Sequence, residues 1–288
     1  REDQIDGRVQ PAAKRLAPLA TLREFQVTTV QALLAGKSVV LTAPTGSGKS
    51  LCYQLATVAK AMPTLVITPL IALMRDQMQA SQTLGLRTAS IWYEMGRKDQ
   101  WWVLSRWIAR QLDILIVSPE RLQAPAFAQC MMSNQTGLVV IDEAHCVVAW
   151  GESFRPAYQR LGDSIRKISR APILAMTATA QAAKTSHIAK SLGLNRPVMI
   201  RAPFSLTNHE LSAQLCQSMD ERMKRLVDFL REPEVLPAIV FTTTRKLCER
   251  VAQMLSSAGA PSLAYHAGMD AGDRASSVAA FQREKNAI

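Results

Sequence analysis

The sequence has no hydrophobic run long enough to cross a membrane. Its longest apolar stretch, residues 64–74, contains Pro69 and ends at Arg75, whereas a transmembrane helix needs about 20 consecutive apolar residues. A charged and then apolar leader is also lacking, which argues against secretion. The first residue is Arg1 rather than methionine, from which we expect a trimmed or internal boundary at this end. These absences favour a protein with no membrane partner.

Cysteine is scarce and dispersed. No two of the five cysteines have the C-x-x-C spacing that is typical of metal and redox motifs. We therefore expect reduced thiols in a cytoplasmic protein, in a bacterial cytosol or nucleoid, rather than disulfides or a zinc site. The five are Cys52, Cys130, Cys146, Cys216 and Cys248.

Aromatic residues make up only 6% of the 288 residues, and acidic residues are outnumbered: Lys and Arg total 34, Asp and Glu 23, so the net charge is +11. Apolar residues account for 48%, enough for a packed core, which excludes a disordered basic tail. The first 218 residues hold 24 of the basic and 14 of the acidic residues. This excess suits a polyanionic partner such as nucleic acid, although a generally basic surface has the same composition.

Short apolar runs alternate with longer stretches of helical spacing. This order is typical of parallel strands in a sheet that helices cover on both faces, an α/β doubly wound fold. The length corresponds to about two domains. The runs predicted as strands are residues 38–42, 64–68, 113–117, 137–141 and 172–176 and, after an irregular inter-domain crossing at 193–218, residues 238–242 and 262–266.

We assign the first domain to residues 1–200 and the second to residues 201–288. In the second, Ser218 and Glu221 have the spacing of a capping box at the start of a helix. Two strand–helix units are too few for a complete doubly wound sheet, so we expect the rest either beyond Ile288 or from a partner. The helices predicted in this domain are residues 219–231, 244–257 and 271–283.

A glycine-rich segment, A-P-T-G-S-G-K-S at residues 43–50, directly follows a predicted strand and opens a helix. Its glycines let backbone N–H groups curl around phosphate oxygens, and the helix N-terminus adds partial positive charge. Lys49 would reach the β- and γ-phosphates of ATP, and Ser50 would place its hydroxyl on Mg²⁺. A glycine–serine turn with a surface lysine is the alternative, which the strand–loop–helix context disfavours. The expected ATP contacts of this loop are Thr45, Gly46, Ser47, Gly48, Lys49 and Ser50.

A second motif, G-L-V-V-I-D-E-A-H at residues 137–145, is a predicted buried strand that ends in two carboxylates. Buried acids are costly unless a metal or hydrogen bonds use them. We assign Asp142 to Mg²⁺, directly or through water, and Glu143 to orienting and deprotonating the attacking water. His145 would connect this site to neighbouring loops. The two motifs together predict an ATPase whose catalytic residues are Lys49, Glu143 and His145.

The ordered set of motifs resembles the superfamily 2 helicases and, within them, the RecQ family, from about Leu22 to Gln282. L-R-E-F-Q at residues 22–26 is similar to the family's adenine-binding motif. The resemblance implies that Arg23 and Gln26 contact adenine, with Gln31 ranked lower. It also implies two RecA-like domains, the second incomplete, that bind ATP and Mg²⁺ between them.

Five further stretches are similar to motifs of that family: T-P-L-I-A-L-M-R-D-Q (68–77), S-P-E-R-L (118–122), M-T-A-T-A (176–180), F-T-T-T-R (241–245) and Y-H-A-G-M (265–269). From the residues alone, serine and threonine at strand ends either hold a phosphate backbone or cap helices. The nucleic-acid contacts expected in these stretches are Thr68, Pro69, Ser118, Arg121, Thr177, Thr243, Arg245 and His266.

The stretch C-V-V-A-W-G-E-S-F-R-P-A-Y, residues 146–158, resembles the aromatic-rich loop with which RecQ-like enzymes sense single-stranded DNA. Trp150 and Phe154 offer flat faces on which bases stack, and Arg155 adds a cation for phosphate or for the neighbouring ATP site. The family's His-Asp pair is replaced here by Glu-Ser, and Glu152 repels phosphate. We therefore expect the coupling between DNA binding and hydrolysis to differ.

Three tryptophans, at positions 101, 102 and 107, lie close in sequence to arginines. Their spacing is imperfect for a single helix face. We therefore expect them to pack inside, with arginines extending to solvent, rather than to form a DNA clamp.

The resemblance implies an ATP-dependent DNA helicase that moves 3′ to 5′ along single-stranded DNA and unwinds duplexes at single-strand–duplex junctions. The family's arginine-bearing G-R-x-G-R motif is not in the sequence, so we expect this chain alone to bind ATP and to hydrolyse it poorly. Two alternatives remain. One is an RNA helicase of the same superfamily; the other is a nucleotide-gated DNA-binding subunit that joins other proteins in a repair or defence complex.

Overall fold

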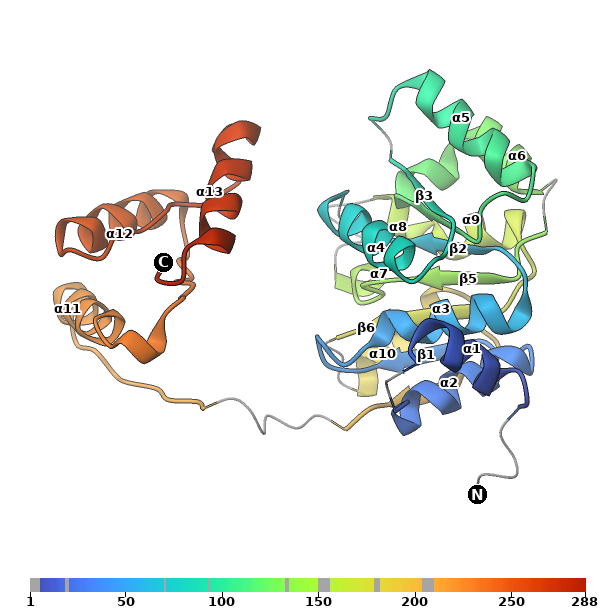
Figure 1. Ribbon diagram of the computed structural model, residues 1–288, viewed down its shortest axis with the longest axis horizontal. Helices are drawn as coiled ribbons and strands as arrows, with labels where there is room; N and C mark the ends of the chain where they lie inside the picture. The colour runs from blue at the N-terminus through green and yellow to red at the C-terminus, as the bar shows by residue number, and fades with distance from the viewer. Residues whose placement is uncertain are drawn as a thin grey trace. The chain divides into compact units, whose positions relative to one another are not determined.

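The computed structural model describes residues 6–18, 21–69, 71–92, 94–132, 135–149, 156–178, 182–203 and 210–288. Contacts divide the chain into two units, Arg1–Ser205 and Leu206–Ile288 (Figure 1). The first unit contains an extended sheet with helices, whereas the second consists of helices and irregular segments.

The first unit is built on one seven-stranded sheet in which every pairing is parallel. The strand order is β3-β4-β2-β5-β6-β1-β7. All five strands predicted in this part of the sequence are confirmed, and so is the α/β class. The strands are β1 (Val39–Thr42), β2 (Thr64–Ile67), β3 (Thr88–Ile91), β4 (Ile114–Val117), β5 (Leu138–Ile141), β6 (Ile173–Thr177) and β7 (Val198–Arg201).

Helices cover both faces of this sheet, because alternate residues of its central strands are apolar on each face. One apolar cluster joins strand residues such as Leu65 and Val139 to helices α5 to α10. The opposite cluster joins residues such as Val66 and Val140 to α1 to α4. The helices are α1 (Val9–Leu16), α2 (Glu24–Leu34), α3 (Lys49–Lys60), α4 (Ile71–Thr83), α5 (Arg97–Ile108), α6 (Pro125–Met132), α7 (Cys146–Ala149), α8 (Pro156–Gln159), α9 (Leu161–Ile168) and α10 (Ala182–Ser191), with a 3-10 helix at Pro119–Gln123.

Two strands of the sheet fall outside the predicted runs. β3, T-A-S-I, has too few apolar residues to be recognised, yet all four of its residues are buried. β7 lies within residues 193–218, which were predicted as an irregular inter-domain crossing with short extended runs; one of these runs pairs with β1 and joins the sheet. β7 is an edge strand beside β1, and its residues alternate between half-buried and exposed.

The carboxyl ends of all seven strands lie along one edge, since the strands run in one direction. In open α/β sheets this edge is where ligands bind. The segments that follow β1, β2, β4, β5 and β6 carry most of the predicted site residues. The fold therefore gathers motifs that are far apart in sequence.

The second unit contains the three predicted helices, α11 (Met219–Leu230), α12 (Arg245–Ser257) and α13 (Ala271–Arg283), and a 3-10 turn at Pro233–Val235. Only one half of the predicted capping box is present: the Ser218 hydroxyl accepts a hydrogen bond from the Glu221 N–H at 3.1 Å. The Glu221 carboxylate accepts from the Gln217 N–H at 2.9 Å instead of from the Ser218 N–H. The core is small and consists of Met223, Leu230, Val251, Leu255 and Ile288.

The two strands predicted in the second unit are wrong, because none of its described residues forms a strand. The Ala238 N–H donates to the Ala287 carbonyl at 3.0 Å, and the Leu263 N–H donates to the Ile288 carbonyl at 2.9 Å. Each predicted strand thus makes one backbone hydrogen bond to the last two residues. One bond is not a ladder, which needs a neighbour along the whole strand.

No helix in the described ranges is long and apolar enough to cross a membrane. The five cysteines are free thiols. Among the described residues, no three or more His, Cys, Asp or Glu side chains are grouped in a way that would bind a metal ion.

Candidate nucleotide and nucleic-acid site

The glycine-rich loop joins β1 to α3 at the carboxyl edge of the sheet. Gly46 and Gly48 adopt positive φ angles of 72° and 82°, which other residues rarely adopt. A side chain at Gly48 would also approach the Gln26 amide nitrogen to 2.7 Å. The Ser47 hydroxyl is buried and has no hydrogen-bond partner among the described residues. The loop therefore exposes backbone N–H groups and one unsatisfied hydroxyl where a phosphate group would fit.

Lys49 is the first residue of α3 and is half-buried. Its ammonium group donates to the carbonyl oxygens of Ala43 and Pro44, each at 3.0 Å. Burial lowers the pKa of Lys49, while the negative charges of Asp142 and Glu143 raise it. The lysine thus lies within electrostatic reach of both acids of the second motif.

Gln26 connects the start of α2 to the phosphate loop. Its side-chain amide donates to the Gly48 carbonyl at 3.1 Å, and its side-chain oxygen accepts from the Arg23 N–H at 2.8 Å. Gln26 is buried, whereas Arg23 is exposed. The two residues predicted to contact adenine are therefore neighbours, and the structure places them beside the loop that follows β1.

Asp142 follows β5 directly and is only 6% exposed. One carboxylate oxygen accepts a hydrogen bond from the Gln77 side-chain amide, and the other accepts from the Glu143 N–H at 3.0 Å. Burial raises the pKa of Asp142, and the charge of Glu143 raises it further. A cation beside this carboxylate would offset both effects.

Glu143 and His145 form an ion pair, with 3.2 Å between Glu143 Oε2 and His145 Nδ1. Hydrogen bonds to Cys146 and Glu143 raise the pKa of His145 to about 10. The hydrogen bond from His145 lowers the pKa of Glu143. At neutral pH the pair therefore consists of a carboxylate and an imidazolium. Glu143 also has a φ of 47°, a conformation that costs a non-glycine residue energy and is common at functional sites.

Thr177, the last residue of β6, connects the two motifs. Its carbonyl accepts from the Ala43 N–H at 3.1 Å, and its hydroxyl lies 3.1 Å from His145 Nδ1. Thr177 was predicted as a DNA contact. In the structure it also contacts the phosphate loop and the acidic motif. Lys49, Asp142, Glu143 and His145 therefore lie at one edge of the sheet.

The donor set of this site matches what ATP and Mg²⁺ require. Mg²⁺ prefers carboxylate and hydroxyl oxygens together with substrate phosphates, which Asp142 and Ser50 would provide. Backbone N–H groups at the start of α3 and the Lys49 ammonium group suit the phosphate chain. The buried Ser47 hydroxyl, which the structure leaves without a partner, fits the same ligand.

Thr68 and Ser118, at the carboxyl ends of β2 and β4, are both buried. Neither hydroxyl has a hydrogen-bond partner among the described residues. The Thr68 N–H donates to the Val117 carbonyl at 3.1 Å, and the Ser118 N–H donates to the Ile91 carbonyl at 3.3 Å. The ends of three adjacent strands, β2, β4 and β3, are thereby in register and present two unsatisfied hydroxyls.

Other predicted nucleic-acid contacts are distributed over both units. Pro69 follows Thr68 directly, and Arg121 extends over the Phe127 ring, with its guanidinium carbon 5.7 Å from the ring centre. Trp150, Phe154 and Arg155 lie outside the described residues.

In the second unit, Thr243, Arg245 and His266 line one cavity of about 640 Å³. This cavity lies between the two segments that were predicted as strands. His266 Nε2 is 3.0 Å from Glu249 Oε1, and Thr243 and Arg245 are exposed. These three predicted contacts therefore line one cavity, although the two strands that were predicted to carry them are not formed.

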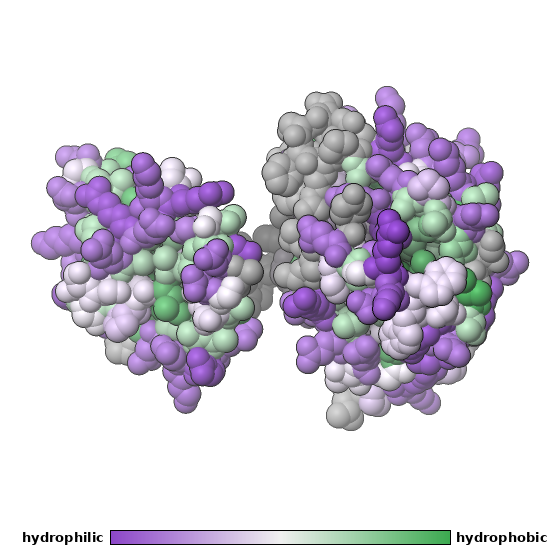
Figure 2. Space-filling model, turned by 90° about the horizontal axis from the view of Figure 1, so that it is seen from above, coloured by the Kyte–Doolittle hydropathy of each residue, from purple (hydrophilic) through white to green (hydrophobic). Residues whose placement is uncertain are grey.

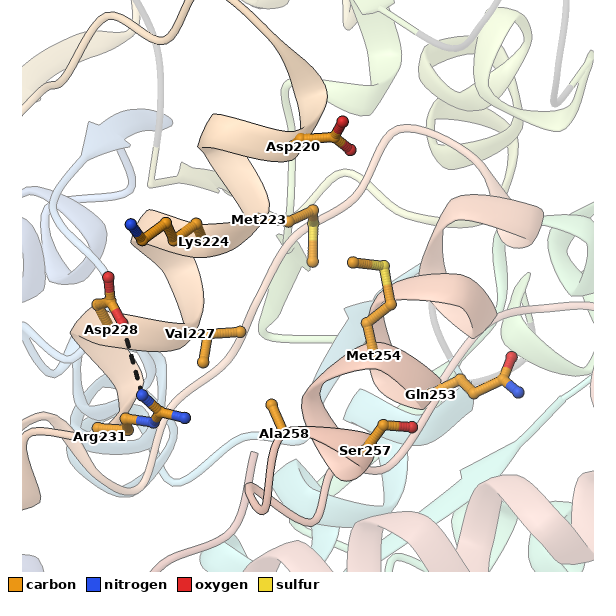
Figure 3. A pocket seen from close by; sticks show the side chains of 10 residues that line it. All are labelled: Asp220, Met223, Lys224, Val227, Asp228, Arg231, Gln253, Met254, Ser257 and Ala258. Atoms are coloured by element: carbon orange, nitrogen blue, oxygen red, sulfur yellow. Dashed lines mark ion pairs between the residues drawn. The ribbon is translucent and has the colours of Figure 1, made fainter.

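A second cavity, of about 770 Å³, lies between α11 and α12 and contains no predicted site residue. Figure 3 shows Met223 and Met254 extending toward each other from the two helices, with the Asp228–Arg231 ion pair at one end. Its lining combines apolar and charged side chains of both signs, so it does not indicate a ligand class.

Gln77 is a contact of the acidic motif that was not predicted as a site residue. It lies in α4 and reaches Asp142 across 65 residues of sequence. The signal was present, because Gln77 ends the T-P-L-I-A-L-M-R-D-Q stretch. Its partner depends on how α4 packs against the sheet, where it contacts β3 and β4, and sequence spacing does not give this packing.

A parallel seven-stranded sheet with a phosphate loop after β1 and an acidic pair after β5 defines a RecA-like helicase domain. The chain belongs to the DEAD/DEAH box helicase family, whose sequence profile matches residues 23–187. The assignment therefore covers both motifs and most of the sheet.

Within that family the similarity is to RecQ-type helicases. The chain is 33% identical over 267 residues to the "ATP-dependent DNA helicase RecQ" of Haemophilus influenzae, covering 92% of this chain and 42% of that protein. It is 32% identical over 256 residues to the "Probable ATP-dependent DNA helicase RecS" of Bacillus subtilis, covering 88% and 51%. The chain thus spans about half the length of these relatives or less.

Two solved helicase structures share the fold. One is Mycobacterium smegmatis Lhr bound to single-stranded DNA and AMP-PNP, with a TM-score of 0.72, 20% identity and coverage of 99% of this chain and 41% of that chain. The other is the DUF1998 helicase MrfA bound to DNA, with a TM-score of 0.71, 18% identity and coverage of 98% and 43%. At these identities the likeness establishes the fold alone.

Proposed function

We propose that this chain is the core of an ATP-dependent DNA helicase of RecQ type, which moves 3′ to 5′ on single-stranded DNA and unwinds duplexes at junctions. The observation that supports this most is the arrangement at the carboxyl edge of the sheet. There Lys49 lies within electrostatic reach of Asp142 and Glu143, and Thr177 contacts both motifs. The direction rests on the resemblance to RecQ helicases.

Each residue of the arrangement has a part in ATP hydrolysis. Lys49 and the N-terminus of α3 bind the phosphate chain, and Ser50 and Asp142 would hold Mg²⁺. The metal would supply positive charge that offsets the negative charge of the phosphates. Glu143, kept ionised by His145, accepts a proton from the attacking water. Gln26 and Arg23 contact the adenine end.

The substrate is a polynucleotide because the same edge continues into groups that suit a phosphate backbone. The unsatisfied hydroxyls of Thr68 and Ser118 and the cation of Arg121 lie next along the sheet. In the second unit, Thr243, Arg245 and His266 would contact the same strand, and Trp150, Phe154 and Arg155 would sense it. Binding through such contacts weakens steeply as the salt concentration rises.

The test compares Glu143→Gln and Lys49→Ala with Glu232→Gln, an exposed glutamate in the second unit. Glu143→Gln is expected to retain ATP binding and to lose about 10²–10⁴-fold in hydrolysis, the usual contribution of a general base. Lys49→Ala should lose ATP binding, and Glu232→Gln should match the unmodified chain.

Binding and hydrolysis are measured with and without single-stranded DNA, and duplexes of DNA and RNA with matched overhangs identify the polynucleotide. The chain alone is expected to turn over slowly, because it has no G-R-x-G-R motif. Hydrolysis by Glu143→Gln at the unmodified rate would contradict the proposed mechanism. Unwinding of RNA in preference to DNA would contradict the proposed substrate.

A further inference from the structure

The outer face of α5 carries two strongly exposed tryptophans. Trp101 is 67% exposed and Trp102 is 59% exposed, whereas Trp107 is 1% exposed. The prediction that all three pack inside is therefore correct for Trp107 only. Exposed aromatic side chains that lie next to each other can mark a binding surface, whereas single exposed apolar residues are common on any protein.

The packing of α5 does not require these two tryptophans. The helix attaches to the sheet through Gln100, Val103, Leu104 and Trp107, which recur every three or four residues and are buried. This spacing defines one face of a helix. Trp101 and Trp102 lie on the other side, so α5 is anchored without them.

The exposed face is basic as well as aromatic. The guanidinium carbon of Arg106 lies 4.8 Å from the centre of the Trp102 ring, a cation–π contact. Arg97 and Lys98 are also exposed on this helix, and Asp99 is its one acidic residue. In the view from above, pale and green surface is interleaved with purple, hydrophilic side chains on the first unit (Figure 2).

The helix α5 begins at the same edge of the sheet as the proposed nucleic-acid contacts. Five residues separate the carboxyl end of β3 from the start of α5, and the Ser118 N–H at the end of β4 donates to the carbonyl of the last residue of β3. A second cation–π pair, with Arg75 6.0 Å from the Trp92 ring centre, follows β3 at the same edge. The first half of α5, which carries Trp101 and Trp102, is therefore the half nearer to Thr68 and Ser118.

We propose that Trp101 and Trp102, together with Arg106 and Lys98, form an accessory site for single-stranded DNA. Bases stack on the indole rings and phosphates pair with the cations, the combination typical of proteins that bind single strands without sequence preference. A protein partner is less well matched. Tryptophan and arginine are common at protein interfaces, but lysine is depleted there, and α5 carries Lys98 together with Arg97 and Arg106 against the single acid Asp99. This inference rests on the proposed function and extends it to a second contact.

The test is the affinity of the chain for a fluorescently labelled oligothymidylate. Trp101→Ala/Trp102→Ala should weaken binding about tenfold or more for each base that stacks. Trp101→Phe/Trp102→Phe should restore most of the affinity because it keeps a flat ring. Phe229→Ala, which removes an aromatic side chain 53% exposed in the second unit, is the control and should leave affinity unchanged. All variants should bind ATP equally.

Photo-crosslinking provides the second readout. An oligonucleotide that contains 5-iododeoxyuridine should crosslink to Trp101 or Trp102, as mapped by mass spectrometry. Unchanged affinity of the double alanine variant together with no crosslink in α5 would overturn this inference and leave the face to a protein partner. Failure of the unmodified chain to bind any single-stranded DNA would overturn the proposed function as well.

Discussion

The two units use similar sequence patterns with different results. In the first, V-V-L-T and L-V-V-I lie inside a sheet with a parallel partner on each side. In the second, A-I-V-F-T and S-L-A-Y-H make only single backbone bonds to the last two residues. Ile239 and Phe241 are 66% and 91% exposed. An apolar, β-rich run becomes a strand only where neighbouring strands pair with it.

Hydrogen exchange should show the largest difference between the units. Amides of β1, β5 and β6 are expected to exchange only through global opening, which costs about 5–15 kcal/mol in ordinary domains. Amides of residues 239–242 and 264–266 should exchange nearly as in an unfolded chain, a difference of about four orders of magnitude or more. Mass spectrometry on peptides from both units measures the exchange rates. Equal protection in the two units would contradict this prediction.

Truncation of a core leucine in each unit should have unequal effects. Leu65→Ala in β2 should reduce the free energy of unfolding of the first unit by about 2–5 kcal/mol, because Leu65 is fully buried. Leu255→Ala should cost less, at the low end of the range of about 2–5 kcal/mol, since Leu255 borders the 640 Å³ cavity. Urea unfolding, monitored by hydrogen exchange of amides in each unit, measures the two free energies of unfolding. A larger loss for Leu255→Ala contradicts it.

Alanine substitutions at two glycines with nearly equal φ angles distinguish the cost of backbone strain from the cost of steric crowding. Gly48 in the first unit has φ 82°, Gly259 in the second has φ 83°, and only Gly48 has a neighbour in the way of a side chain. Gly259→Ala should cost about 1 kcal/mol for the left-handed backbone alone.

Gly48→Ala should cost about 1 kcal/mol more than Gly259→Ala because it also displaces the Gln26 hydrogen bond. Thermal unfolding measures both costs. In a double-mutant cycle, Gln26→Ala should recover part of the Gly48→Ala loss. Additive losses in that cycle would show that Gln26 is not the obstacle.

A further expected effect concerns pH. Hydrogen bonds to Cys146 and Glu143 raise the pKa of His145 to about 10. The protonated imidazole therefore stabilises the first unit fully below the ordinary histidine pKa of about 6.5, as long as Glu143 is ionised. That contribution should fall as pH rises from there through about 10. His145→Gln should remove this dependence, so the two unfolding free energies converge at high pH. NMR titration of the imidazole gives the same information directly, and a midpoint near 6.5 would contradict it.

The sequence was sufficient where a single stretch carries its own signal. Near-continuous apolar runs predicted β1, β2, β4, β5 and β6, which the structure contains. Motif spacing predicted Lys49, Asp142 and Glu143 as site residues, and the structure brings them to one edge of the sheet. It was insufficient for β3, whose Thr88 and Ser90 are buried only because α4 and β4 cover them. The strands predicted in the second unit, the Gln77–Asp142 bond and the exposure of Trp101 depend on what lies beside them, which local pattern does not contain.

The two hydrogen-bonding contacts of Thr177, at the end of β6, couple the phosphate loop to the acidic motif. The backbone of Thr177 is tied to Ala43 and its side chain to His145, so the two attachments cannot move independently. A displacement of this strand end by a fraction of an ångström alters the start of the phosphate loop and the imidazole beside Glu143 at the same moment. Thr177→Val would keep the backbone hydrogen bond to Ala43 and remove the side-chain contact with His145. The phosphate loop and the imidazole could then move independently of each other.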